Sequence, residues 1–125
     1  MTEIEDDVAQ LNRDLTDIGT IYEANLKTSP VPGNGVFTDD LTVPSGTYVI
    51  SFPLPYSTQM GALLSDVTHN TSLAGATGSS GNGYGVITYI GQFNEQTTLR
   101  IINGSGNACT FTDNLGSKLR AIKLK

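Results

Sequence analysis

The sequence has one cysteine, one histidine and no tryptophan among its 125 residues. The single cysteine, Cys109, excludes a disulfide within the chain and any zinc site built from several cysteines. Because Cys109 lies in a run of alternating apolar residues, we expect it to be a small buried side chain. Charged residues make up only 15% of the chain, and the small basic group at its C-terminal end is most simply a solvated strand end. Nucleic-acid binding needs a concentrated basic surface and is not expected.

Long apolar runs are scarce as well. No stretch approaches the roughly 18 apolar residues that a membrane-spanning helix needs, and no short apolar segment of the secretory type follows Met1. We therefore expect no membrane association and no signal peptide. The prediction is a chain made in a cytoplasm, which would reach the outside of a cell only as part of a larger particle.

Groups of residues that carry catalysis are also lacking. His69 has no serine, aspartate or metal-ligand spacing around it, so it is expected in a turn or at the surface. Asp39 and Asp40 could form a calcium ligand pair, although a turn or a strand cap explains them more simply. The glycine-rich segments 81–83 and 104–106 do not open a helix after a strand, as a phosphate-binding loop would. We predict a protein that is not an enzyme and uses no metal and no cofactor.

The N-terminal segment, in contrast, has a clear pattern, because apolar residues recur there at alternating steps of three and four. Such spacing forms one narrow stripe along a helix, which is typical of a coiled coil. The stripe mixes β-branched and γ-branched residues, which favours three helices over two. We predict that residues 1–27 are the coiled-coil stalk of a homotrimer, with a helix folded back on its own domain as the alternative. The stripe consists of Met1, Ile4, Val8, Leu11, Leu15, Ile18 and Tyr22.

The helical pattern ends at Pro30 and Pro32, because proline lacks the amide donor and restricts the residue before it. Residues 28–34 are predicted to be a stiff linker, and residues 35–125 a β domain. Residues 74–83 are so rich in Gly, Ser and Thr that we expect a mobile loop. Turn residues divide the domain into eight strands, which suit a two-sheet sandwich. The expected strands are 36–38, 41–43, 47–54, 62–70, 84–93, 97–103, 108–112 and 118–124.

Two of the expected strands, 47–54 and 84–93, are apolar on both faces. An antiparallel sheet usually exposes one face to water, so a strand that is apolar on both sides needs a second surface to cover it. Another subunit is the simplest cover, and we expect the domain to supply more of the buried area of the trimer than the stalk. The predicted trimer interface of the domain consists of Tyr48, Phe52, Ile87, Tyr89 and Phe93.

Residues 43–52, V-P-S-G-T-Y-V-I-S-F, resemble the opening of the tumour necrosis factor-like and complement-component-like jelly rolls. The small versions in bacterial collagen-like surface proteins of the BclA type and in bacteriophage fibres are especially similar. The likeness continues through 69–75, 97–103 and 119–124 and covers about residues 41–124. It departs from the family in lacking the glycine of the usual N-G-T turn and in having a coiled coil where others have a collagen-like repeat. The resemblance implies a mainly β jelly-roll sandwich that forms tight trimers around a three-fold axis.

A helical stalk in front of a trimeric head is the arrangement of viral fibres, spikes and receptor-binding proteins. The resemblance therefore implies a bacteriophage structural fibre or spike protein in the virion, whose stalk contacts a virion component. Its head would display a surface for a host glycan or protein. The alternative is a passive trimer, such as a capsid decoration or a bacterial surface or spore-coat protein without its own ligand. Aromatic and amide side chains beside long loops suit glycans, and the candidates are Tyr56, Asn82 and Tyr84.

Overall fold

The computed structural model of the chain describes residues 18–27, 29–78, 83–111 and 117–125, which form β-strands and no helix. None of these residues belongs to a helix that could cross a membrane. The strands are β1 (Ile21–Asn25), β2 (Leu41–Val43), β3 (Gly46–Tyr56), β4 (Met60–Asp66), β5 (Thr71–Gly78), β6 (Gly83–Phe93), β7 (Thr97–Asn103) and β8 (Lys118–Lys123).

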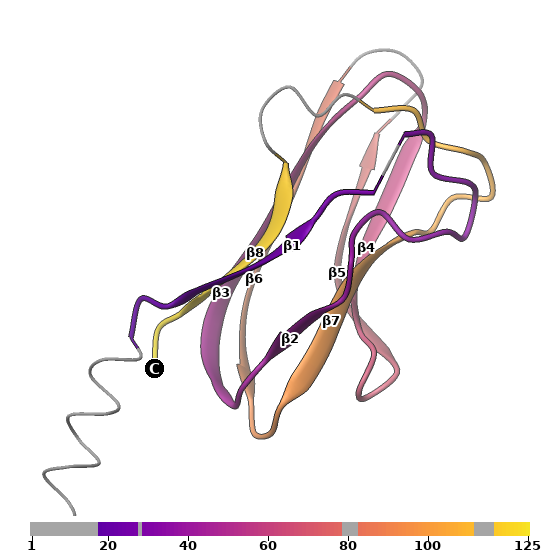
Figure 1. Cartoon of the computed structure of the whole chain (residues 1–125). Helices are drawn as coiled ribbons and strands as arrows, with labels where there is room; N and C mark the ends of the chain where they lie inside the picture. The colour runs from indigo at the N-terminus through magenta and orange to yellow at the C-terminus, as the bar shows by residue number, and fades with distance from the viewer. Residues whose placement is uncertain (1–17, 28, 79–82, 112–116) are drawn as a thin grey trace, which may run out of the picture.

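The strands form two four-stranded antiparallel sheets that pack face to face (Figure 1). The first sheet has the order β1-β8-β3-β6, and the second sheet has the order β2-β7-β4-β5. Neighbours in a sheet are mostly distant in the sequence, so both sheets depend on pairings between the two halves of the chain. The predicted mainly β, two-sheet sandwich is confirmed.

Strand β3 shows how the sequence produces this packing. Its residues alternate between buried and half-exposed positions, because successive side chains of a strand point to opposite faces. Full burial of a large apolar side chain stabilises the fold by about 1.5–3 kcal/mol, so one strand of this kind contributes strongly to the core. The side chains that β3 buries between the sheets are Tyr48, Ile50, Phe52 and Leu54.

The expected helix does not extend to residue 27, because residues 21–25 form strand β1, which pairs along β8. Gly19 precedes the strand with φ +86°, a backbone conformation that a right-handed helix does not contain. Tyr22 therefore belongs to the sandwich, where its ring meets the edge of Tyr48 at a centroid distance of 6.0 Å. Ile18 lies in the turn before β1. The remaining stalk positions, Ile4, Val8, Leu11 and Leu15, fall outside the described residues.

The predicted linker is also part of the sandwich. Val31 is buried and exchanges two backbone hydrogen bonds with Cys109, at 2.9 and 2.8 Å. Asn103 is fully buried, and its side-chain amide donates to the carbonyl oxygens of Val31 and Pro32 at 3.3 and 3.2 Å. These contacts hold the proline-containing segment against the end of β7. The β domain therefore includes β1 and the contacts of Val31 and Pro32, which lie ahead of residue 35.

Strands β2 and β7 have the predicted bounds, whereas the described residues of the expected strands 36–38 and 108–112 form only isolated bridges. Residues 71–78 form strand β5, which pairs with β4. Residues 74–78 of this strand fall within the segment expected to be a mobile loop. The small residues of β5 make room for neighbours, since a Cβ on Gly78 would lie 2.2 Å from the Tyr56 ring. The glycines that predicted a mobile loop from the sequence therefore permit close packing in this strand.

Candidate functional site

The residues predicted to form the trimer interface of the head lie inside one chain. Tyr48, Phe52, Ile87 and Phe93 are at most 6% exposed and belong to the core between the sheets. Tyr89 is partly buried and packs against the same core. The interface assignment is therefore corrected. Alternation identifies which residues share a face of a strand, but both faces of these strands are apolar, and the face with more aromatic rings is the one that packs inward.

The opposite face of the same strands is exposed and carries a continuous line of apolar residues. Ile21 lies opposite Ile122, which lies opposite Val49, which in turn lies opposite Ile90. This line, here named the apolar row, crosses all four strands of the first sheet. Ile21 is 55% exposed and Ile90 is 65% exposed, although both are fully apolar.

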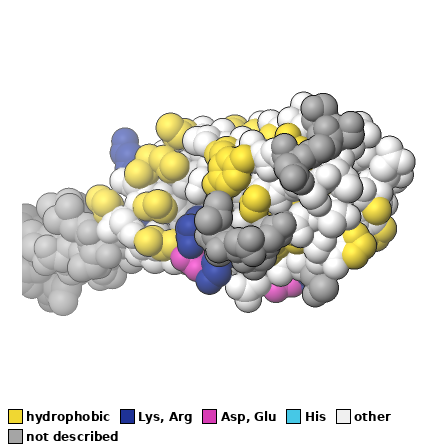
Figure 2. All heavy atoms as spheres, turned by 90° about the horizontal axis from the view of Figure 1, so that it is seen from above, with side chains coloured by type: hydrophobic (Ala, Val, Ile, Leu, Met, Phe, Trp, Pro, Cys, Tyr) yellow, Lys and Arg dark blue, Asp and Glu magenta, His cyan; other side chains and the backbone are white. Residues whose placement is uncertain are grey.

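A second apolar area lies further along the same face. Val86 is 48% exposed opposite Pro53, and Tyr84 is 54% exposed opposite Pro55. Tyr84, Val86 and Ile90 all point outward, because even-numbered residues of β6 share one face. The view from above in Figure 2 shows hydrophobic side chains in several clusters beside a small group of basic and acidic side chains.

The polar part of this face is an ion group between the two apolar areas. Glu23 Oε1 accepts a hydrogen bond from Arg120 Nε at 3.2 Å, and Glu23 Oε2 accepts one from Lys118 Nζ at 3.3 Å. Hydrogen bonds from Lys118 and then Arg120 lower the pKa of Glu23 below its ordinary value. Two cations share one carboxylate here, so the group carries one excess positive charge. The face is thus mainly apolar with one compact charged centre.

The three candidate ligand residues are not brought together. The Tyr56 ring is half-buried above two glycines, where a Cβ on Gly83 would lie 2.3 Å from its hydroxyl oxygen. Tyr56 lies opposite Gly83, and Tyr84 is the next residue, so Tyr56 and Tyr84 point to opposite faces of the sheet. Asn82 falls outside the described residues. Only Tyr84 offers an exposed ring, and it lies on the apolar face described above.

The other sequence candidates have structural partners. Asp39 pairs with Lys27 at 2.7 Å and Asp40 pairs with Arg100 at 2.9 Å, so the two carboxylates do not converge on a shared ligand. Within the described ranges, no group of three or more His, Cys, Asp or Glu side chains is arranged to hold a metal ion. Cys109 is fully buried, as predicted, and burial raises the pKa of its thiol.

The sequence analysis did not identify Ile21, Val49 and Ile122 as residues of the outer face of the first sheet. The signal for Val49 was present, since the alternation of β3 separates it from the buried residues. Ile21 and Ile122 join Val49 only through the pairing of β1 and β3 with β8, which periodicity along one segment cannot indicate.

No protein-family model matches the sequence, and a search of curated proteins finds no match. Solved structures do match. The Eiger TNF structure from S. frugiperda aligns over 86% of this chain and 94% of that chain, with a TM-score of 0.64 and 12% identity. Murine APRIL at pH 5.0 aligns over 85% of this chain and 99% of that chain, with a TM-score of 0.65 and 12% identity. Murine APRIL at pH 8.5 aligns over 83% of this chain and 98% of that chain, with a TM-score of 0.63 and 10% identity. Such identities establish the fold alone, and that fold is the tumour necrosis factor-like jelly-roll β-sandwich.

Proposed function

We propose that this chain is a homotrimeric structural protein of the fibre or spike type, assembled through the outer face of the first sheet. The observation that carries the proposal is the apolar row together with the second apolar area on the same face, which contains Tyr84 and Val86. Eight large hydrophobic side chains are exposed among the described residues, and four of them, Ile21, Tyr84, Val86 and Ile90, lie on this one face. Contiguous apolar surface of this kind on a soluble domain marks an interaction site.

A second copy of the chain is the simplest cover for this face. The carboxylate of Glu23 at its centre is paired with Arg120 and Lys118, so its burial costs less than that of an isolated carboxylate. Three copies are favoured over two by the heptad pattern at the N-terminus and by the trimers of the jelly rolls that the sequence resembles.

The fibre or spike role follows from the arrangement of the two parts. Gly19 N donates to the carbonyl oxygen of Lys123 at 2.7 Å, so the described N-terminal residues and the C-terminus lie at the same end of the sandwich (Figure 1). A stalk that precedes residue 18 would leave the head at this end and could attach to a virion component of a bacteriophage. The sides of the head would then display a surface for a host glycan or protein.

Sedimentation equilibrium of the full chain at micromolar concentration tests the assembly. The expected mass is three times the 13.2 kDa of one chain. A folded protein that sediments at the mass of one chain would overturn the proposal, and the fibre interpretation would fail with it.

A further inference from the structure

A polar hollow of about 270 Å³ lies on the outer side of the second sheet, away from the apolar face. It is formed by the end of β4, the turn from β4 to β5, the start of β5 and the middle of β7. The volume is just below the range of about 300–1,000 Å³ that is typical of small-molecule sites, so it suits a group the size of one sugar ring.

Most of the side chains that line the hollow are polar. Ser65 is nine-tenths buried and lines the hollow. The side chains of Asn70, Thr71 and Ser72 also line the hollow and are exposed. A hydroxyl or amide group that faces the hollow can bond to a ligand there in exchange for its bond to water.

The walls of the hollow are held in place before any ligand arrives. Arg100 Nε and Nη2 each donate to one oxygen of Asp40 at 2.9 Å, which fixes the plane of the guanidinium. Asn70 has φ +51°, the left-handed conformation that closes the turn between β4 and β5. Preorganised groups lose little entropy on binding, which favours affinity for a small ligand.

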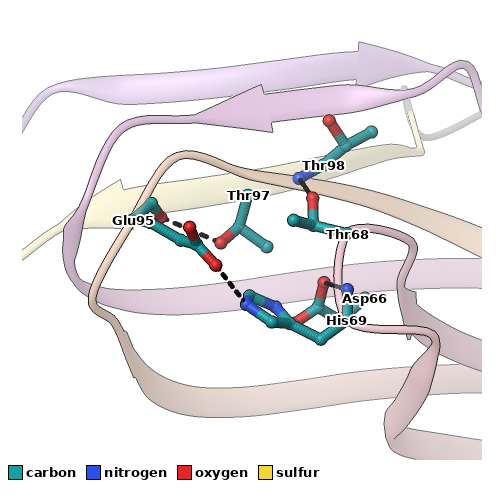
Figure 3. A network of polar contacts seen from close by, with 6 residues as sticks. All are labelled: Asp66, Thr68, His69, Glu95, Thr97 and Thr98. Carbon is teal, nitrogen blue, oxygen red and sulfur yellow. Dashed lines mark hydrogen bonds and ion pairs between the residues drawn. The ribbon is translucent and has the colours of Figure 1, made fainter.

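His69 fastens the same turn to the turn that connects β6 and β7 (Figure 3). Its Nδ1 lies 2.6 Å from Asp66 Oδ2, and its Nε2 lies 2.7 Å from Glu95 Oε1. The backbone amide of His69 also donates to Asp66 Oδ1 at 3.0 Å. Both oxygens of the buried Asp66 are therefore occupied by His69, so this carboxylate is a support of the hollow and not a free ligand group.

The charges around the hollow identify the class of ligand. Arg100 is neutralised by Asp40, and the single cation His69 faces the two carboxylates of Asp66 and Glu95. No excess positive charge is available for a phosphate, a sulfate or a carboxylate. The exposed apolar surface of Val67, together with Ile102, provides contact for the C–H groups of a ring.

We infer that this hollow binds a neutral polyhydroxylated group, such as one sugar ring of a glycan, through the hydroxyl and amide side chains of Ser65, Asn70, Thr71 and Ser72. The inference rests on the display role proposed above and specifies its ligand, but the site is complete in one chain and does not require the trimer.

The test is binding of the full-length protein to an array of neutral and acidic glycans. The expected result is binding to neutral glycans, weakened about three- to tenfold by Ser65→Ala, which removes one neutral hydrogen bond. Ser72→Leu, which fills the hollow, should abolish binding. Gln59→Ala, an exposed position at the opposite end of β4 from the hollow, is the matched control and should leave binding unchanged. Circular dichroism and thermal unfolding of each variant show that the fold is retained.

Two outcomes would overturn the inference. Glycan binding that survives Ser72→Leu but is lost in Tyr84→Ala would place the site on the apolar face. Silence across the array from a protein that sediments as a trimer would reject the sugar site while the trimeric assembly stands, and the chain would then be a passive structural trimer.

Discussion

Ile90 on β6 lies directly opposite Val49 on β3, and both side chains face away from the core of their own chain. Two aliphatic residues in this register form a cross-strand pair of the kind that a sheet uses to bury a face. Here the pair belongs to the apolar row, in which Val49 is partly buried and Ile90 is 65% exposed. In the proposed trimer, this pair would be buried against a second copy of the chain.

Replacing Ile90 with aspartate should prevent self-association without unfolding the head. The side chain is 65% exposed in one chain, so the free energy of unfolding of the isolated head should change by no more than about 0.5 kcal/mol. In the assembly, a carboxylate would be buried without a partner, which is strongly unfavourable. Sedimentation velocity should show a shift to smaller species. Thr77→Asp on the second sheet is the control and should leave the mass unchanged.

Replacing Leu11 and Leu15 with alanine should weaken association much less than Ile90→Asp does. The part of the heptad pattern that precedes Ile18 spans only about two heptads, a length at which helices are marginal in water, so the head should supply most of the assembly energy. Light scattering at a series of protein concentrations measures the difference. Complete dissociation of the variant with alanine at positions 11 and 15, at a concentration where the native protein stays assembled, would show that the head does not supply most of the assembly energy.

Much of the sandwich could be predicted from local patterns. The alternation in β3 identified Tyr48 and Phe52 as one face, and turn residues bounded β2 and β7 correctly. The direction of that face could not be predicted, because it depends on which sheet lies opposite. Tyr22 satisfied a helical spacing and a strand alternation equally well, and the choice was made by pairing with Ala121, about a hundred residues away.

The polar hollow was beyond prediction for a related reason. Ser65, Ser72 and Arg100 come from three strands, and they become neighbours only because β4 pairs with both β5 and β7. His69 was expected in a turn, which is where it lies, but Glu95 is 26 residues away and nothing in the sequence connects them. A site built from long-range pairings leaves little trace in any single segment.

Replacing Phe52 with alanine separates the observed core from the interface that the sequence suggested. Phe52 is 1% exposed in one chain and packs near Phe37, with a centroid distance of 6.3 Å. Truncation of a buried phenylalanine costs about 3–5 kcal/mol, so we expect a large fall in the free energy of unfolding. Urea unfolding followed by circular dichroism measures it. Dissociation into stable folded monomers would mean that Phe52 belongs to an interface.

The stability of the protein should decrease as the pH rises past the ordinary range of histidine. Hydrogen bonds to Asp66 and then to Glu95 raise the pKa of His69 above 6.5, because only the imidazolium can donate from both nitrogens. A raised pKa in the folded state means that the contribution is fully present below pH 6.5 and is lost as the pH passes through the raised value.

Thermal unfolding of the native protein and of His69→Gln, measured between about pH 5 and pH 9, tests this dependence. The native protein should exceed the variant in melting temperature at the acidic end, and the two curves should converge at the alkaline end. Parallel curves across the range would show that the His69 contacts contribute nothing that depends on protonation.

Cys109 should resist alkylation as long as the chain is folded. The thiol is fully buried, burial raises its pKa, and the thiolate is the form that reacts. Iodoacetamide at pH 8 should therefore leave the native protein unmodified and label it fully in guanidinium chloride, as intact-mass spectrometry would show. Val31→Ala, which opens the packing beside Cys109, should accelerate labelling in the absence of denaturant, because local opening would then expose the sulfur. Rapid labelling of the native protein would mean that the segment with Val31 does not cover this end of the sandwich.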